Sequence, residues 1–413
     1  MKKKLLLSEF LTAILITGLI LANVMHLGTV QAATEVSGII SSDTTWTQAN
    51  SPYNLTGIVT VNEGVTLTID AGATIYLNSY NIQVNGTLAA RGTSTTPIQI
   101  NKEIYGLMNP FYTVGITFNP SSADWNSQTG TGCIIENVIG TRWTISINNA
   151  SPKINQNSDV NIDVNGGSPV ISGNTPYGIT VEGGSPTISN NTMEGYLGKG
   201  AFGGNNYGVF LGGSNNALVF DNTFIGLYYP GAIIASSGTP MIERNLIKGS
   251  HSSNPSSVPS IGITVYSASP LIENNTITEN NIGLNIYYDS LSNPPSTPPS
   301  PTIVYNNIQN NSEYNIYLGD LTAVYGLTAP DVNASYNWWG TTNISSINQT
   351  IYDNKNNFTV GTVTFMPILT SPNPEALPNT SAEIPELPLW IILPIFIIAT
   401  LLLAAVYFKK RKR

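Results

Sequence analysis

A short segment that recurs along the middle of the chain constrains the fold more than any other feature. The first three copies begin at Ser151, Ser168 and Ser185, so each begins 17 residues after the one before. Each starts with Ser-Pro and places an aliphatic residue three positions, and an asparagine six positions, after the serine. A fixed unit predicts a solenoid of stacked coils. Further copies with irregular gaps begin at Asn216, Thr239, Ser269 and Ser300.

A second pattern supplies another strand for each coil. It is a four-residue segment at 115–118, 144–147, 161–164, 178–181, 208–211, 231–234, 262–265, 283–286 and 315–318. Alternate residues of a strand face opposite sides. The second and fourth positions are therefore expected to stack inside the rod, and the third to face solvent. This interpretation gives an outward row of Asp163, Thr180, Phe210, Ile233, Thr264, Asn285 and Tyr317.

The asparagines at the sixth position have a structural interpretation. An inward asparagine at a corner can adopt left-handed backbone geometry and hydrogen-bond the same residue one coil away. We therefore expect an asparagine ladder that satisfies the polar groups of the buried turns. Its predicted members are Asn157, Asn174, Asn191, Asn222, Asn245, Asn275 and Asn306.

The regions on either side of the repeats extend the same solenoid. Short alternating strands separated by Gly or Asn fill residues 33–114, where Asn85-Gly86 fits either a hairpin turn or a coil corner. We assign 33–114 to a β cap and first coils, 115–319 to the repeats, and 320–368 to a last coil and cap closed by Trp338 and Trp339.

Segments at both ends of the chain predict the cellular location of the protein. Lys2, Lys3 and Lys4 precede an apolar run and small residues at a cleavage site, which predicts a signal peptide at 1–32. After a Pro-rich stalk at 369–386, the 22 uncharged residues of 387–408 are long enough to cross ~30 Å of hydrocarbon. The basic tail at 409–413 favours the cytoplasmic side. We predict a single-pass membrane protein with its body at the cell surface.

The charge balance excludes one class of partner. Three of the 16 basic residues lie in the leader and five in the tail, and Glu9 is the leader's one acid among 24, so residues 33–386 hold 8 basic and 23 acidic groups. This net charge of minus 15 argues against nucleic acid, whose phosphates require a basic surface. The single cysteine, Cys133, excludes an internal disulfide.

These residues resemble the right-handed parallel β-helix proteins of the pectate-lyase-like superfold, whose short β-helix repeats also occur in NosD-like proteins. Gly57 to Ile75 resembles the first coils of extracellular members, and Asn337-Trp-Trp-Gly340 resembles their closing coil. Ile384-Pro-Glu-Leu-Pro388 resembles an archaeal surface-sorting signal, with Leu in place of Phe. The resemblance implies an all-β, single-stranded right-handed parallel β-helix. It leaves function open, because the superfold includes lyases, hydrolases, epimerases and adhesins.

Few residues suggest metal chemistry. Glu243 and Glu273 occupy the same position in successive copies and can share a cation, or both can be solvated corner residues. Asp159 and Asp163 form a second oxygen-rich patch together with Asn161. We expect no cofactor and keep calcium as the alternative at these four carboxylates. Asp221 and Arg244, one coil apart, are interpreted as an ion pair.

Aromatic residues give a functional hypothesis. Exposed rings can stack on sugar faces, although strand propensity and packing at the rim of the coils explain the same residues. The predicted glycan-binding set is Tyr196, Phe202, Tyr228, Tyr229, Tyr266, Tyr287 and Tyr288.

We therefore expect a cell-surface β-helix that binds a polysaccharide, another glycan or an envelope protein without catalysis, and that contacts the membrane through its own helix. The alternatives are a polysaccharide lyase or glycoside hydrolase, which would need two carboxyl groups on one outer face, and a purely structural envelope protein. Eleven Asn-x-Ser/Thr sequences fit an exported glycoprotein.

Overall fold

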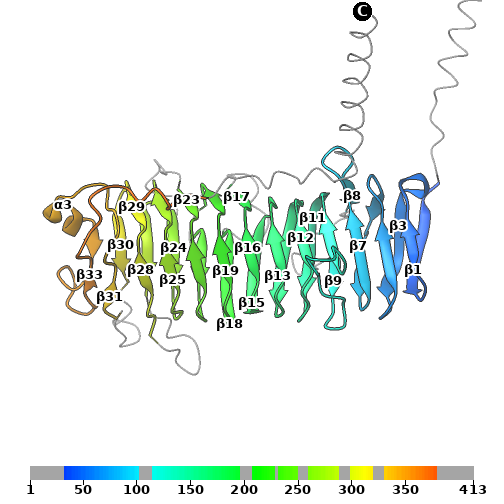
Figure 1. Ribbon diagram of the computed structural model, residues 1–413, viewed down its shortest axis with the longest axis horizontal. Coiled ribbons are helices and arrows are strands. Elements are labelled where there is room, and N and C mark those ends of the chain that lie inside the picture. The colour runs from blue at the N-terminus through cyan, green and yellow to red at the C-terminus, as the bar shows by residue number, and fades with distance from the viewer. Residues whose placement is uncertain are drawn as a thin grey trace, which may run out of the picture.

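The computed structural model describes residues 32–101, 114–195, 207–227, 231–249, 259–287, 298–319 and 330–378. They form one elongated rod of stacked coils, which runs from β1 (Thr34–Ile40) to α3 (Ile344–Gln349) (Figure 1). Residues 1–31 of the predicted signal peptide, the predicted membrane helix at 387–408 and the basic tail lie outside the described residues. Within the described ranges no helix has the length and apolar character needed to cross a membrane.

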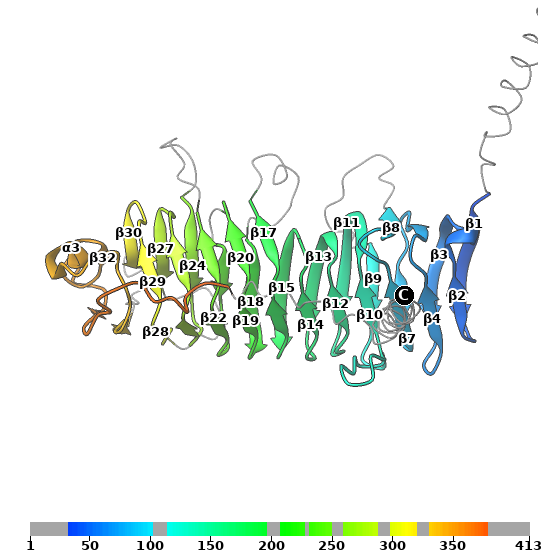
Figure 2. The same ribbon diagram turned by 45° about the horizontal axis from the view of Figure 1, so that its top comes forward.

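Three parallel sheets form the sides of the rod (Figure 2). The large sheet has 15 strands: β1, β3 (Tyr53–Val61), β5 (Thr74–Tyr76), β6 (Ile82–Val84), β8 (Ile98–Asn101), β9 (Gly115–Phe118), β11 (Val138–Ile147), β13 (Ser158–Asn165), β15 (Gly178–Gly184), β18 (Val209–Asn215), β21 (Ile233–Ala235), β24 (Ile261–Val265), β27 (Ile282–Ile286), β30 (Tyr314–Leu318) and β32 (Ile351–Tyr352).

The second sheet has 13 strands: β2 (Thr44–Trp46), β4 (Thr66–Ile69), β7 (Thr87–Arg91), β10 (Ile134–Glu136), β12 (Lys153–Asn155), β14 (Val170–Ser172), β16 (Thr187–Ser189), β19 (Leu218–Phe220), β22 (Met241–Glu243), β25 (Leu271–Glu273), β28 (Thr302–Val304), β31 (Val332–Asn333) and β33 (Val363–Thr364). The third sheet has five strands: β17 (Thr192–Glu194), β20 (Thr223–Ile225), β23 (Leu246–Lys248), β26 (Thr276–Thr278) and β29 (Asn307–Gln309).

The predicted parallel β-helix is therefore confirmed. In each later coil the chain passes from the large sheet to the second, then the third, and returns beside its starting strand. Asn85-Gly86 joins β6 of the large sheet to β7 of the second, so it is a coil corner and not a hairpin turn. At the far end, buried Trp339 and Ile347 cover the last coil, and Trp338 Nε1 donates to Gln309 Oε1 at 2.9 Å.

Aliphatic side chains stack along the inside of the large sheet, one from each coil. The row in register is Ile145, Ile162, Ile179, Val209, Ile233, Ile263, Leu284, Ile316 and Ile351. Each of these side chains is fully buried. This column of branched residues forms the continuous core that single coils cannot form alone.

One strand differs from its predicted frame. Gly231 was expected to match Gly208, which would turn Ile233 outward, but Ile233 pairs with Val209 and points inward. Ile234 then occupies the outward row, beside Phe210. The glycine match misplaced the frame by one residue, and a slip of one residue exchanges the two faces of a strand. Aliphatic stacking inside the rod decides the register.

The asparagine residues form the ladder at the corner between the second and third sheets. Asn174 shows the pattern: its backbone N and its Nδ2 both donate to Asn191 Oδ1, at 2.9 and 3.0 Å, and Nδ2 also donates to Ile154 O at 3.0 Å. The same bonds link Asn157, Asn174, Asn191, Asn222, Asn245, Asn275, Asn306 and Asn337. All eight are at most 1% exposed, so the ladder satisfies backbone groups that water cannot reach.

The left-handed backbone at this corner belongs to the residue before each ladder asparagine. Asn190, Asp221 and Arg244 have φ of 55, 54 and 49°, and Tyr305 has φ of 58°. The expectation that the ladder asparagines themselves are left-handed is wrong. The chain bends at the residue before the asparagine, and the asparagine side chain can then point into the rod.

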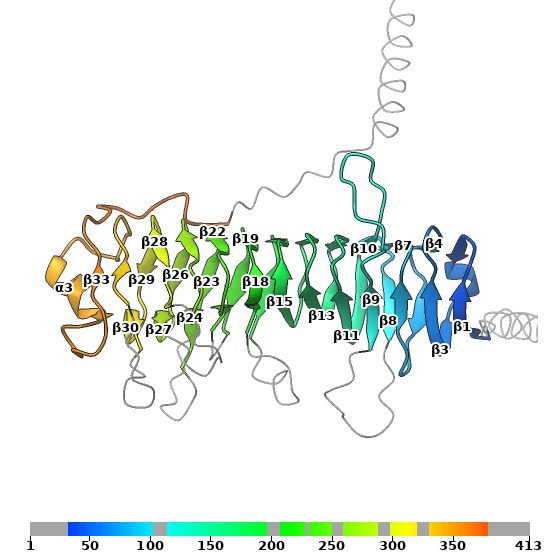
Figure 3. The ribbon, with the colours of Figure 1, turned by 90° about the horizontal axis from the view of Figure 1, so that it is seen from below.

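The segment after the last coil returns along the rod. We call 366–378 the return segment; Figure 3 shows it on the side that carries β22 and β28, away from β24, β27 and β30. Asn373 N donates to Asn307 Oδ1 at 2.8 Å, and Asn307 Nδ2 donates to Asn373 O at 3.0 Å. Thr276 Oγ1 also donates to Ala376 O. Residues 369–378, the first part of the predicted Pro-rich stalk, therefore lie along the ladder corner.

The ladder predicts a large effect of a single buried amide. In Asn222→Ala, Asn191 N loses its acceptor and Ile188 O loses a donor. We expect a loss of about 3 kcal/mol in the free energy of unfolding, because buried groups are left unsatisfied. The control is Asn216→Ala, an exposed asparagine of the same coil, with a loss under about 0.5 kcal/mol. Equal effects in denaturant unfolding would contradict a stabilising role of the ladder.

Candidate binding surface

The outer face of the large sheet carries a row of side chains in strict register. From β11 to β32 the row is Ser146, Asp163, Thr180, Phe210, Ile234, Thr264, Asn285, Tyr317 and Tyr352. Ile234 and Thr264, in the middle, are only 2% and 1% exposed. The accessible part of the row thus has an acidic end and a tyrosine end.

Five half-buried tyrosines gather at the tyrosine end, and we call them the tyrosine surface. Tyr266 and Tyr287 meet edge to face, with centroids 4.5 Å apart and an interplanar angle of 89°. Tyr317 and Tyr352 are stacked at 4.6 Å and 25°. Tyr314 contacts both of these last rings, at 5.5 and 5.4 Å. Edge-to-face and offset stacked arrangements are the favourable geometries for aromatic pairs.

Strand alternation explains how these rings reach one face. Tyr266 follows buried Val265 at the end of β24, and Tyr287 follows buried Ile286 at the end of β27. Both rings therefore point outward, two residues further along the chain than the row members Thr264 and Asn285. Gly319 follows β30 at the matching place, where an added Cβ would lie 2.8 Å from Tyr287 Cβ. The glycine leaves room beside the Tyr287 ring.

Asn285 adds a polar group to the same surface. It lies in the row between Thr264 and Tyr317, and its Oδ1 is buried without a hydrogen-bond donor in the described part of the structure. The other two such atoms are indole nitrogens, of Trp143 and Trp339. A buried acceptor left unpaired costs about 1–3 kcal/mol, and a bound ligand with a hydroxyl or amide donor would remove that cost.

The sequence predicted only part of this surface. Tyr266 and Tyr287 lie together as proposed, whereas Tyr314, Tyr317, Tyr352 and Asn285 were not in the predicted binding set. The predicted outward row already contained Tyr317 and Asn285, so their positions in the repeat could have added them to the binding set. Tyr352 lies in the cap, beyond the regular repeats, where the repeat pattern does not predict it. The remaining predicted residues lie outside the described residues: Tyr196, Phe202, Tyr228, Tyr229 and Tyr288.

The acidic end is built around Asp163. Burial raises the pKa of the Asp163 carboxyl, and a hydrogen bond from the Thr180 side chain partly opposes this shift. Thr180 Oγ1 lies 3.1 Å from Tyr207 OH, and the Tyr207 ring is tilted against Phe210 at 5.7 Å. Asp159 lies near the start of β13 with left-handed φ of 54°, and it is half-buried like Asn161 and Asp163, with buried residues between them.

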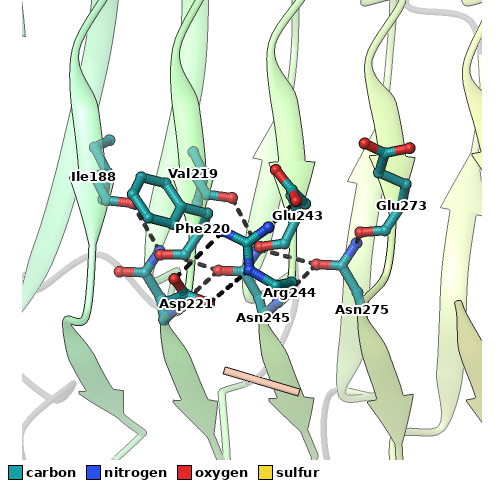
Figure 4. Close-up of polar contacts among 10 residues, drawn as sticks. Ile188, Val219, Phe220, Asp221, Glu243, Arg244, Asn245, Glu273 and Asn275 are labelled. Atoms are coloured by element: carbon teal, nitrogen blue, oxygen red, sulfur yellow. Dashed lines mark hydrogen bonds and ion pairs between the residues drawn. The ribbon is translucent and has the colours of Figure 1, made fainter. Parts of the chain in front are cut away.

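The two glutamates of the second sheet are neighbours, as their repeat positions indicated. Glu243 and Glu273 pair in register across β22 and β25. Arg244, beside them, pairs with Asp221 at 3.0 Å, contacts the Glu243 carboxylate, and places its guanidinium 5.5 Å from the centre of the Phe220 ring (Figure 4). The predicted Asp221–Arg244 ion pair is therefore present.

The described carboxylates do not converge on a common metal position. Asp159 and Asp163 lie on the large sheet, whereas Glu243 and Glu273 lie on the second. Among the described residues, no three His, Cys, Asp or Glu side chains are placed to hold one ion. Calcium binding by either pair stays a prediction.

A comparison with protein-family models agrees with the architecture. Residues 177–360 match the family model described as "Right handed beta helix region". A solved structure of a mutant of the periplasmic alginate epimerase AlgG is similar with 12% identity and a TM-score of 0.41, over 80% of this chain and 85% of that one. The comparison with curated proteins gave no match. With its parallel sheets, the molecule has the parallel β-helix fold, and residues 177–360 match the right-handed form.

The raised pKa of Asp163 predicts a pH dependence. The folded protein keeps this proton at a higher pH than the unfolded chain, so stability falls as pH rises from the ordinary value of 3.8 through the raised pKa. In Asp163→Asn this loss disappears. We compare the melting temperature of the variant with that of the wild type at each pH. We expect the difference, variant minus wild type, to be about 1–2 °C larger at pH 7 than at a pH below 3.8. Thermal unfolding checks this, with exposed Glu63→Gln as a control; an unchanged difference would contradict it.

Proposed function

We propose that this protein binds glycans on the tyrosine surface without catalysis, as a cell-surface β-helix. The observation that carries the proposal is the combination of aligned tyrosine rings with the unpaired Asn285 acceptor in one outward row. A sugar offers what both groups need. Its C–H faces stack on aromatic rings, and its hydroxyls donate hydrogen bonds.

The chemistry of the surface favours binding over bond cleavage. Hydrolysis of a glycoside uses two carboxyl groups about 5–9 Å apart. In the described outward row the single acid is Asp163, which lies on β13, whereas Tyr317 lies on β30, six strand spacings away. At about 4.8 Å per spacing this is about 29 Å along the rod. The tyrosine surface thus offers platforms and an acceptor, and the single acid of the described outward row lies far from it.

The return segment supports display of this surface. It follows the ladder corner, which lies between the second and third sheets and therefore opposite the large sheet (Figure 3). We propose that the signal peptide exports the chain and that residues 387–408 anchor it. Residues 379–386 can span at most about 28 Å. The anchor would then lie on the side of the ladder corner, and the tyrosine surface would face away from the membrane.

Removal of two stacked rings tests the surface directly. The variant combines Tyr317→Ala with Tyr352→Ala. For any polysaccharide that binds the wild-type protein, we expect the affinity of this variant to be at least about tenfold lower, because the two stacked rings are lost. The measurement is retention of the full-length protein, in detergent, on a panel of immobilised neutral glycans and polyuronates. Tyr80→Ala is the control, an exposed tyrosine of the first coils.

The same panel separates the alternatives. Product formation from any glycan would contradict the non-catalytic proposal and favour a lyase or hydrolase. Retention that is equal in the double variant and in wild type would remove the tyrosine surface from consideration. An absence of retention on every glycan would favour a purely structural envelope protein.

Asn285 gives a second, independent prediction. Asn285→Leu removes an acceptor that has no donor in the described structure, so we expect the melting temperature to stay the same or rise. Glycan affinity should nevertheless fall about five- to tenfold, because a ligand hydroxyl loses its partner. Calorimetry gives both quantities. A loss of stability together with unchanged affinity would show that Asn285 serves the fold alone.

A further inference from the structure

The acidic end of the outward row contains a second built arrangement, separate from the tyrosine surface. Asp163, Thr180 and Phe210 are consecutive members of the row, on β13, β15 and β18. Tyr207, just before β18, adds its hydroxyl and ring. The buried positions Ile234 and Thr264 interrupt the row between the two ends.

The polar groups of this arrangement lie close together. Asp163 pairs in register with Thr180. Thr180 Oγ1 lies 3.1 Å from Tyr207 OH, and either hydroxyl can be the donor in that bond. An ionised carboxylate only accepts hydrogen bonds. A ligand that binds the Asp163 carboxylate must therefore bring donors.

A glycine allows the aromatic and acidic groups to lie side by side. An added Cβ at Gly212 would lie 2.6 Å from Phe210 Cε1 and 2.7 Å from Glu182 Oε2. Any larger residue would displace the ring or the carboxylate. The charges of Asp163 and Glu182 both reach the Tyr207 hydroxyl and, with burial as the main cause, raise its pKa. The site is therefore a negative, acceptor-rich position beside two aromatic rings.

We propose that Asp163, Thr180, Tyr207 and Phe210 form a second saccharide subsite, which binds a neutral sugar through its hydroxyl donors and rejects polyuronates. A neutral sugar supplies both hydroxyl donors and an apolar face for the rings. A uronate carboxylate would instead meet Asp163 and Glu182, and like charges brought together at a binding site are unfavourable. The subsite uses none of the residues of the tyrosine surface.

The test measures binding of short sugars to the full-length protein in detergent. The probes are a neutral oligosaccharide, drawn from gluco- and manno-oligosaccharides, an oligogalacturonate of equal length, and calcium chloride, each titrated by calorimetry. The variants are Asp163→Asn, which removes the charge at nearly constant shape, and Tyr207→Phe, which removes the hydroxyl and keeps the ring. The matched control is Glu63→Gln, an exposed acid of the first coils.

We expect both variants to weaken binding of a neutral oligosaccharide about fivefold or more, and the control to leave it unchanged. The Tyr317→Ala, Tyr352→Ala variant should keep this binding. Asp163→Asn should reduce the preference for the neutral probe over the uronate. Circular dichroism verifies that each variant is folded, and Tyr207→Phe supplies the conservative change if Asp163→Asn is not.

Other outcomes overturn the proposal. Calcium binding that is lost in Asp163→Asn, without sugar binding, would make the group a cation site. Preferred binding of the uronate would contradict the selectivity. If neutral sugar binding depends only on Tyr317 and Tyr352, the subsite is wrong and the tyrosine surface stands. If it depends only on Asp163 and Tyr207, the subsite stands and the tyrosine surface fails.

Discussion

The asparagine ladder is the interaction on which the rest of the structure depends. In each rung the side-chain oxygen of one asparagine accepts hydrogen bonds from the backbone and side-chain nitrogens of the equivalent residue in the previous coil. Consecutive rungs are separated by as few as 17 residues and as many as 31. From Asn157 to Asn337 the bond therefore links each coil to the next irrespective of the length of chain between them. This is why inserts of different length leave the core column intact.

A fixed corner also tolerates unfavourable residues beside it. Tyr305 and Tyr336 are bulky residues in left-handed conformation, with φ of 58 and 59°, and their exposed rings stack at 5.8 Å. Such conformations persist where surrounding bonds determine the backbone. Arg244 uses the same kind of position to reach Asp221 one coil away. The ladder thus allows the outer side of the corner to vary in charge and size.

The same register turns separated residues into surfaces. Tyr317 and Tyr352 are 35 positions apart in sequence, yet they stack because β30 and β32 pair. Asn285 joins them from β27, at the cost of an unpaired oxygen. At the other end of the row, Asp163 on β13 pairs in register with Thr180 on β15, and Thr180 contacts Tyr207, which lies two positions before β18. Both proposed sites are therefore open rows along the rod.

The sequence by itself determined the solenoid, the inward and outward alternation of most strands, seven of the eight ladder residues and the Asp221–Arg244 pair, because these follow from a spacing that repeats locally. The tertiary structure alone decided the frame at Ile233, the coil corner at Asn85, and the return of 369–378 along the ladder. It also assembled Tyr314 and Tyr352 beside Tyr317. These features depend on which residues pair across coils, and core packing and hydrogen bonds between distant segments set that pairing, which no local pattern records.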